Sequence, residues 1–339
     1  MVIKYACGLD AAGVMVNQLI INILSGWLMK RRRRFVNGEC NHIYQRTVNG
    51  FNLFYDREDY LVFYMILSVS VRKFNVSILM LCLMIDHIHI LLDAVSCKEM
   101  ADFVRYFTSI YVREYNDSIG RTGQMMYKSF GSAPKKGDKR TRSAIVYIGN
   151  NPVEKKICHE AEDYRWNFIA YMKDGNPFSM KIPVEKCRRR LRNAMAEVRA
   201  EAAADRYIGY FRLRRLMAGL ADDEKEFLTD HIISQYFPFD VETLESYYSD
   251  LDQMSAAMKA SAGSDYDIKE KVTPHSDLIY EEMVKIVRAE TGLKYVREVI
   301  MLPAEEKFRL ARMIQSSLPA AEMFQISKFL HMPVKQAGA

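Results

Sequence analysis

Two histidines separated by one residue are the feature of this sequence best suited to chemistry. His87, Ile88 and His89 begin an alternating stretch, HIHILLDA, which is typical of a β-strand. Side chains alternate between the faces of a strand, so both imidazoles share one face, about 7 Å apart at roughly 3.3 Å per residue. Such a pair can bind one metal ion, and Asp86 is placed to orient a ring. Two unrelated surface histidines are the alternative.

A tyrosine and an asparagine form the second candidate constellation. Tyr147 and Asn151 belong to the segment YIGNNPV. Both residues also lie in an apolar stretch of helical spacing over residues 143–151. Residues four apart lie on one face of a helix, so the phenol and amide oxygens are expected to project together. Pro152 follows directly and is expected to end or bend the helix. Taken alone, a core or surface tyrosine near a helix end explains the same pattern.

The elements that must position these residues can be predicted from hydrophobic periodicity. Ser96 and Glu99 form a potential capping box at the start of one helix. Residues 120–142 are polar and rich in glycine and lysine, which indicates a mobile loop. The order of elements predicts an α+β domain with an antiparallel sheet. The predicted strands cover residues 41–47, 76–84 and 87–94, and the predicted helices cover about 56–72, 96–115 and 143–151.

Composition and charge narrow the class of protein. The chain has 339 residues, 49% of them hydrophobic and 27% charged, which is ordinary for about two globular domains. Residues 29–171 hold 22 Lys and Arg against 15 Asp and Glu, whereas the rest of the chain after residue 171 is close to neutral. A basic first half predicts a polyanionic partner, and a solubilising surface is the alternative.

The six cysteines are far apart and form no CxxC pair. This spacing argues against a zinc ribbon and against a disulfide framework, and a reducing cytoplasm is the expected compartment.

Four segments in this order, LCLMIDHIHILL, SIYVREYNDSIGRTGQMMYKSF, YIGNNPV and EDYRWNF, resemble the single-tyrosine transposases of the insertion-sequence 200 type. Within that type the REP-associated branch is the most similar, and these proteins are Y1 members of the HUH endonucleases. The resemblance covers about residues 29–172. It implies a ferredoxin-like antiparallel sheet with helices on it, followed here by an all-α C-terminal region.

The resemblance also implies roles for the two constellations. His87 and His89 match the metal ligands of the family, Asn151 matches the amide ligand that completes the site, and Tyr147 matches the nucleophile. Asp86 stands where relatives often have Asn or Glu. The implied ion is Mg²⁺ or Mn²⁺, and the implied products are a 5′-phosphotyrosine and a free 3′-hydroxyl. No small-molecule cofactor is expected, and activity should fall below about pH 6, where imidazoles take up protons.

The implied partner is single-stranded or hairpin DNA in a bacterial cytoplasm, at the nucleoid. Some relatives exchange the tyrosine helix between subunits and others act as monomers, so a homodimer stays open. Residues 132–142 depart most from the pattern of the relatives. The expected DNA contacts are Arg31, Arg32, Arg33, Arg121, Lys128, Lys135, Lys136, Lys139, Arg140 and Arg142, with Tyr127 or Phe130 stacking on a base.

The amino terminus allows three interpretations. Residues 11–29 are largely apolar and precede a basic run, as in a membrane anchor. A signal peptide is the second interpretation, but its basic residues would precede the apolar run. Asn17, Gln18 and Asn22 count against an anchor. The resemblance favours Met29 as the natural start, because relatives begin a few residues before such a basic run. Residues 1–28 are then an upstream extension, and a membrane partner is not expected.

After the catalytic domain, expected over 29–172, helical patterns dominate. We expect a helical region and linker over 173–275 and a helical C-terminal segment over 276–339. The segment resembles a helix-turn-helix, and a packing bundle is the alternative. The remaining histidines are expected to be structural: His42, His159, His231, His275 and His331. The alternative to an enzyme is a domesticated protein that binds repeated palindromic hairpins without cleaving them.

Overall fold

The structure is a computed structural model that describes residues 34–183, 187–262 and 276–332. The described residues from Phe35 onward belong to one compact unit. The extension over 1–28 and the basic residues Arg31, Arg32 and Arg33 lie outside the described residues. The domain boundaries expected at residues 172 and 275 stay predictions.

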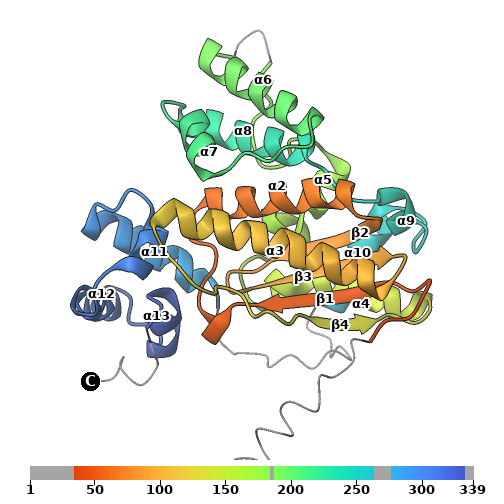
Figure 1. The fold of residues 1–339 in the computed structure, drawn as a ribbon, viewed down its shortest axis with the longest axis horizontal. Helices are drawn as coiled ribbons and strands as arrows, with labels where there is room; N and C mark the ends of the chain where they lie inside the picture. Colours follow the sequence, from red (N-terminus) through yellow and green to blue (C-terminus); the bar gives the residue numbers. More distant parts are fainter. Residues whose placement is uncertain (1–33, 184–186, 263–275, 333–339) are drawn as a thin grey trace, which may run out of the picture. The chain divides into compact units, whose positions relative to one another are not determined.

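A four-stranded antiparallel sheet forms the centre of the fold (Figure 1). Its strands are β1 (Asn41–Arg46), β2 (Val76–Leu83), β3 (His87–Ala94) and β4 (Gly131–Pro134), in the order β2-β3-β1-β4. The helices α2 and α3 follow β1 and β3, so the connections are those of a ferredoxin-like fold. The predicted α+β class and the three predicted strands are therefore confirmed.

The predicted mobile loop over residues 120–142 is wrong, because it contains β4 and the start of a helix. The sequence of β4, GSAP, carries no hydrophobic alternation, so only its pairing with β1 reveals it. Gly131 lies opposite Tyr44, and a Cβ atom there would be 1.9 Å from the Tyr44 ring. Glycine is therefore required where the aromatic ring crosses the edge strand.

Helices α2 (Arg57–Lys73) and α3 (Cys97–Ile119) cover one face of the sheet, over Ile88 and Ile90. One of the two hydrogen bonds of the predicted capping box is confirmed, because Ser96 Oγ accepts a hydrogen bond from the Glu99 backbone amide at 3.1 Å. The second half of the box does not form, because the Glu99 carboxylate accepts from the Asn75 amide instead.

Helix α4 (Asp138–Glu154) lies on the opposite face, over β2 and β3, and α10 (Leu251–Ser261) packs against it. This helix begins at Asp138 rather than Ser143, and it continues past Pro152 to Glu154. The predicted end at Asn151 is wrong because a proline in the last turn removes only one backbone hydrogen bond. Tyr147 and Leu91 belong to the apolar cluster between this helix and the sheet.

Helices make up the described chain after β4, which confirms the all-α C-terminal region. None of the described helices is long and apolar enough to span a bilayer. The remaining helices are α5 (Ile169–Lys173), α6 (Arg189–Ala203), α7 (Tyr210–Met217), α8 (Asp222–Gln235), α9 (Val241–Glu245), α11 (Leu278–Thr291), α12 (Ala304–Ser317) and α13 (Met323–Phe329), with 3-10 turns η1 (Val48–Gly50), η2 (Ala161–Asp163), η3 (Arg165–Asn167) and η5 (Val296–Met301).

The C-terminal helices are joined to the first turn of α2 by buried polar contacts. Arg297 and Asp59 form an ion pair whose two side chains are fully buried. Asp59 also accepts a hydrogen bond from the Tyr210 hydroxyl at 3.0 Å. Asp56 accepts from the Val296 amide at 3.0 Å. The helix-turn-helix expected in the C-terminal segment stays a prediction, and the residues from 333 onward lie outside the described residues.

Candidate active site

Strand β3 directs His87 and His89 to the face that α4 covers, while Ile88 and Ile90 point into the core on the other side. The two imidazole centroids are 4.9 Å apart. His89 is fully buried and His87 is 9% exposed. The alternation predicted from the sequence therefore brings the two rings side by side.

Helix α4 brings Tyr147 and Asn151 to the same two histidines. The ring centroid of Tyr147 lies 5.6 Å from that of His89, and the Asn151 amide nitrogen lies 3.3 Å from Nε2 of His89. Both side chains are 3% exposed. The four residues of the two sequence constellations thus form one cluster between strand and helix.

Asp86 fixes the orientation of the His87 ring. Its Oδ1 accepts a hydrogen bond from Nδ1 of His87 at 2.5 Å, and its Oδ2 accepts from Nζ of Lys328 at 3.1 Å. Burial alone would raise the pKa of Asp86, but His87 and Lys328 together hold that pKa below its usual range. The carboxylate therefore stays ionised and leaves Nε2 as the available nitrogen of His87.

His42 belongs to the cluster, although we expected it to be structural. Its Nε2 lies 2.9 Å from Nδ1 of His89. Because the Asn151 amide donates to Nε2 of His89, the His89 proton sits on Nδ1 and is donated to His42. The signal was present in the alternation of NHIYQRT, which places His42, Tyr44 and Arg46 on one face. The register then sets Tyr44 opposite His89 and Arg46 opposite His87.

The donor set of the cluster fits a hard divalent cation. Within the described residues, no three His, Cys, Asp or Glu side chains are arranged to bind a metal, so a third ligand has to be of another type. Among the buried side-chain atoms of the described residues that have no hydrogen-bond partner, two belong to this cluster, Nε2 of His87 and Oδ1 of Asn151. Both are atoms that bind divalent ions.

The protonation state of His89 suits a metal ligand. Burial, followed by the charges of His87 and His42, lowers the pKa of His89 well below its usual value. The ring is therefore neutral at physiological pH, with Nε2 unprotonated, which is the form that binds metal.

The cluster is closed to solvent in this structure. Helix α10 holds α4 on the sheet, because the Asn150 amide donates to the Met258 carbonyl at 2.8 Å. Met258 also packs on Gly149, where a Cβ atom would lie 2.6 Å from its methyl group. A phosphate group reaches Tyr147 only if α4 or the side chains around it shift.

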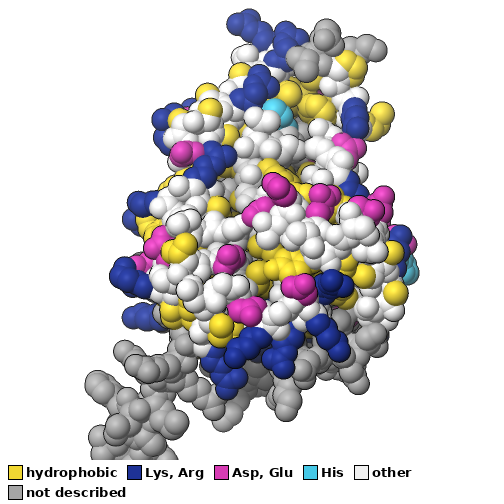
Figure 2. All heavy atoms as spheres, turned by 90° about the vertical axis from the view of Figure 1, so that its right-hand side faces the viewer, with side chains coloured by type: hydrophobic (Ala, Val, Ile, Leu, Met, Phe, Trp, Pro, Cys, Tyr) yellow, Lys and Arg dark blue, Asp and Glu magenta, His cyan; other side chains and the backbone are white. Residues whose placement is uncertain are grey.

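Most of the predicted DNA contacts are on the surface. Lys128, Lys136, Lys139, Arg140 and Arg142 are exposed, Lys135 is half-buried, and the Tyr127 ring is 47% exposed. Figure 2 shows Lys and Arg side chains gathered low on the side of the molecule that it views.

Arg121 differs from these residues because its guanidinium is used within the protein. It donates to Oδ1 of Asn116 at 2.9 Å and to the carbonyls of Gly123 and Gln124. These contacts fasten the turn that follows α3, which indicates a structural role.

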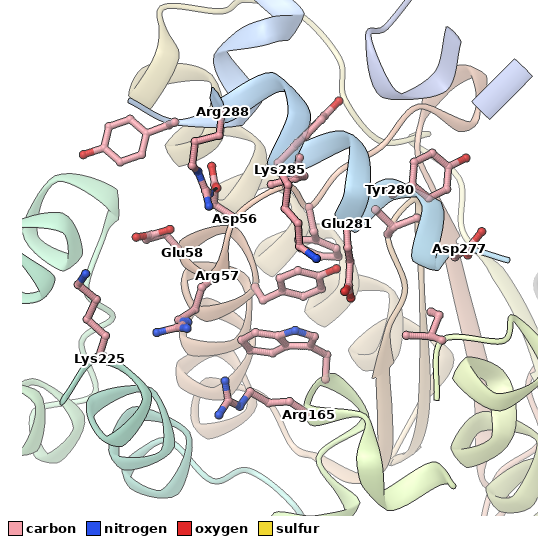
Figure 3. Close-up of a pocket in the computed structure, with 18 of the residues that line it drawn as sticks. Asp56, Arg57, Glu58, Arg165, Lys225, Asp277, Tyr280, Glu281, Lys285 and Arg288 are labelled. Carbon is pink, nitrogen blue, oxygen red and sulfur yellow. Dashed lines mark hydrogen bonds and ion pairs between the residues drawn. The ribbon is translucent and has the colours of Figure 1, made fainter. Parts of the chain in front are cut away.

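A pocket of about 740 Å³ lies away from the histidine cluster, between the first turn of α2, α11 and η3 (Figure 3). None of the four cluster residues lines it. Most of the positively charged side chains that line the pocket form ion pairs. Examples are Arg288 with Asp56 and Arg165 with Glu226, both at 2.6 Å. The pocket therefore lacks the unbalanced positive charge that a phosphate site requires.

Residues 22–151 match the family model described as "Transposase IS200 like". The matched segment contains both histidines and Tyr147, and it ends at Asn151. This segment is therefore similar to the IS200-like transposases. Every described helix from α5 onward lies outside the segment that matches this family model.

One solved structure is similar to the chain, a REP-associated tyrosine transposase bound to a REP hairpin. The identity is 14% and the TM-score is 0.37, and the match covers 46% of this chain and 94% of that chain. No curated protein matches the chain.

Proposed function

We propose that this protein is a metal-dependent endonuclease and strand transferase that acts on single-stranded DNA beside hairpins. One observation carries the proposal. Two buried, unpaired ligand atoms, Nε2 of His87 and Oδ1 of Asn151, lie in the same cluster as Tyr147, inside a transposase segment. Unpaired buried polar atoms are costly, and they persist where a ligand satisfies them.

His87, His89 and Asn151 would hold Mg²⁺ or Mn²⁺. When bound, the ion polarises the scissile phosphate and stabilises the charge that develops on its oxygens. His42 and Asp86 hold the proton of His89 and of His87 on Nδ1, so that Nε2 is the unprotonated nitrogen of each ring.

Tyr147 supplies the nucleophile. Its phenol oxygen forms a bond to phosphorus as the bond from phosphorus to the 3′-oxygen breaks, which gives a 5′-phosphotyrosine. The phenol loses its proton, and the departing 3′-oxygen gains one. A second 3′-hydroxyl reverses the step and joins a new strand, so no nucleotide cofactor is needed. Tyr147 lies against the histidines of its own chain, so we propose that it acts without exchange between subunits.

The strand next to the cluster offers a place for the DNA. Tyr44 is 40% exposed and Arg46 is exposed, and both lie on the face of His42. An exposed aromatic ring stacks on an unpaired base, and a guanidinium binds the adjoining phosphate. With the lysines and arginines of residues 128–142, these side chains provide contacts for a single strand or a hairpin end. We infer that the enzyme works at the bacterial nucleoid.

The test uses the full chain and single-stranded oligonucleotides from the DNA on both sides of the gene. We expect a discrete cleavage product with Mg²⁺ or Mn²⁺ and none with EDTA. The variants His87→Ala and Asn151→Ala should reduce cleavage to background while hairpin binding persists. Hairpin binding without cleavage by the wild type, across several metals and flanks, would instead favour the non-cleaving regulator.

A further inference from the structure

A lysine from the last described helix reaches the metal-ligand cluster. Nζ of Lys328, on α13, lies 3.1 Å from Oδ2 of Asp86, whose other oxygen lies 2.5 Å from Nδ1 of His87. The side chains of the three residues are 28%, 19% and 11% exposed, in that order. A continuous chain of hydrogen bonds therefore joins the C-terminal helices to the ring whose Nε2 is unpaired.

The position of Lys328 is held by its backbone and does not depend on its flexible side chain. The Asn52 amide donates to the Lys328 carbonyl at 3.3 Å, and His331 donates to the Asn52 carbonyl at 2.8 Å. The Tyr55 hydroxyl donates to the Phe329 carbonyl at 2.5 Å. These contacts dock α13 on the segment that follows η1.

The turn after β1 brings Gly50 next to the ion pair. Its φ is +66°, a left-handed conformation that favours glycine, and a Cβ atom there would be at ordinary contact distance, 3.4 Å, from Cε of Lys328.

We propose that Lys328 is a positioning residue of the metal centre, an inference that rests on the proposed function. Lys328 holds one oxygen of Asp86, so that the other stays directed at His87 and fixes the ring with Nε2 toward the ion. Removal of a group that hydrogen-bonds to a metal ligand typically lowers metal affinity about 10–100-fold. Because Lys328 lies outside the segment that matches the family, the C-terminal helices are part of what assembles the centre.

The test measures Mn²⁺ affinity of the full chain without DNA, by the electron paramagnetic resonance signal of free Mn²⁺. We expect Lys328→Met, which keeps the stem but removes the donor, to weaken binding about 10-fold. Lys328→Arg should restore affinity to within about 3-fold, since it keeps both charge and donor. The double variant Asp86→Asn, Lys328→Met should bind as weakly as Asp86→Asn alone, because Lys328 acts through Asp86.

A charge control separates positioning from electrostatics. Lys155 also places a positive charge toward His89. Coulomb's law predicts that loss of a nearby cation strengthens binding of Mn²⁺. Lys155→Met should therefore bind more tightly than the wild type and Lys328→Met more weakly. Both variants remove one positive charge. Opposite effects on Mn²⁺ affinity would therefore show that Lys328 acts by positioning Asp86 and not by its charge alone.

The turnover of cleavage gives an independent readout. Lys328→Met should lower kcat and leave KM for the oligonucleotide within about 2-fold, because Lys328 acts through Asp86 and not on the DNA. Thermal unfolding checks that each variant is folded, and Lys328→Gln is the second neutral variant should the Met variant unfold. Unchanged Mn²⁺ affinity in a folded neutral variant, or effects that add in the double variant, would overturn the role of Lys328. A wild type that binds no Mn²⁺ at the histidines would overturn the proposed function as well.

Discussion

The amide nitrogen of Asn151 lies 3.3 Å from Nε2 of His89, although 62 residues separate the two in the chain. Strand β3 carries one residue and helix α4 the other, so the contact exists only while α4 is packed across the sheet. Tyr147 is on the same helix one turn earlier. Any shift of α4 therefore moves the proposed nucleophile and one proposed ligand together, which would couple the assembly of the ion site to the placement of the tyrosine.

The hydrogen bond between His42 and His89 predicts a role for His42 in metal binding. His42→Phe keeps an aromatic ring but removes the acceptor that holds the His89 proton on Nδ1. We expect Mn²⁺ affinity to fall about 10-fold, as for other groups behind metal ligands. The control His159→Phe changes an exposed histidine after α4 and should leave affinity unchanged. Equal affinities of the two variants would show that His42 only packs.

The buried ion pair between Arg297 and Asp59 predicts a large effect on stability. Arg297→Met leaves the Asp59 charge buried without its partner, which should lower the free energy of unfolding by about 3–5 kcal/mol. Arg309→Met is the matched control, because Arg309 and Glu306, which pair at 3.0 Å, are 53% and 48% exposed. Its cost should be about 1 kcal/mol or less. Urea unfolding of both variants tests the contrast, and similar costs would contradict it.

His331 predicts a loss of stability in acid. Burial lowers the pKa of His331 to about 3, although the hydrogen bond to the Asn52 carbonyl opposes this shift. In the unfolded chain its pKa is about 6.5, so between about pH 6.5 and 3 the unfolded chain binds a proton that the folded chain does not. Above about pH 6.5 His331 therefore does not lower the free energy of unfolding. Below this pH the free energy of unfolding falls as the pH decreases.

At pH 5 this loss amounts to about 2 kcal/mol. His331→Gln keeps a donor for the carbonyl and does not titrate, so the variant should lose about 2 kcal/mol less than the wild type between pH 7.5 and pH 5. Urea unfolding at the two values measures the difference. If wild type and variant decline equally, His331 is not the group responsible.

The surface lysines and arginines predict a salt-dependent contribution to DNA binding. Arg140→Ala should reduce the slope of log affinity against log salt concentration by about 0.7, the value for one phosphate contact on a single strand. Arg121→Ala should leave the slope unchanged and lower stability by about 1–3 kcal/mol, because its donors are used within the protein. Fluorescence anisotropy over a salt series distinguishes them, and a smaller slope for Arg121→Ala would reverse the assignment.

The sequence predicted the elements whose periodicity is local and missed those that depend on pairing. The alternating pattern predicts the strand that carries His87 and His89, and helical spacing predicts the helix that carries Tyr147. The same two patterns identify these residues as candidates for the site. Strand β4 carries no such pattern, since GSAP becomes a strand only beside β1. The place of His42 required the register of β1 against β3, which neither strand determines alone.

Lys328 illustrates the same limit over a longer distance. It is 242 residues from Asp86 in the chain, and no local pattern links an ordinary helix lysine to a turn between two strands. Its neighbours in space follow from the docking of α13 on the segment after η1, which depends on many contacts at once.

Formation of a covalent protein–DNA adduct tests the central claim most directly. The full chain is incubated with single-stranded oligonucleotides from the flanking DNA and Mn²⁺, and the products are separated on a denaturing gel. We expect a shifted band that requires the metal, that maps to Tyr147 by mass spectrometry and that Tyr147→Phe removes, while Tyr248→Phe retains it. Cleavage that proceeds in Tyr147→Phe, or an adduct on another tyrosine, would contradict the assignment of Tyr147 as the nucleophile.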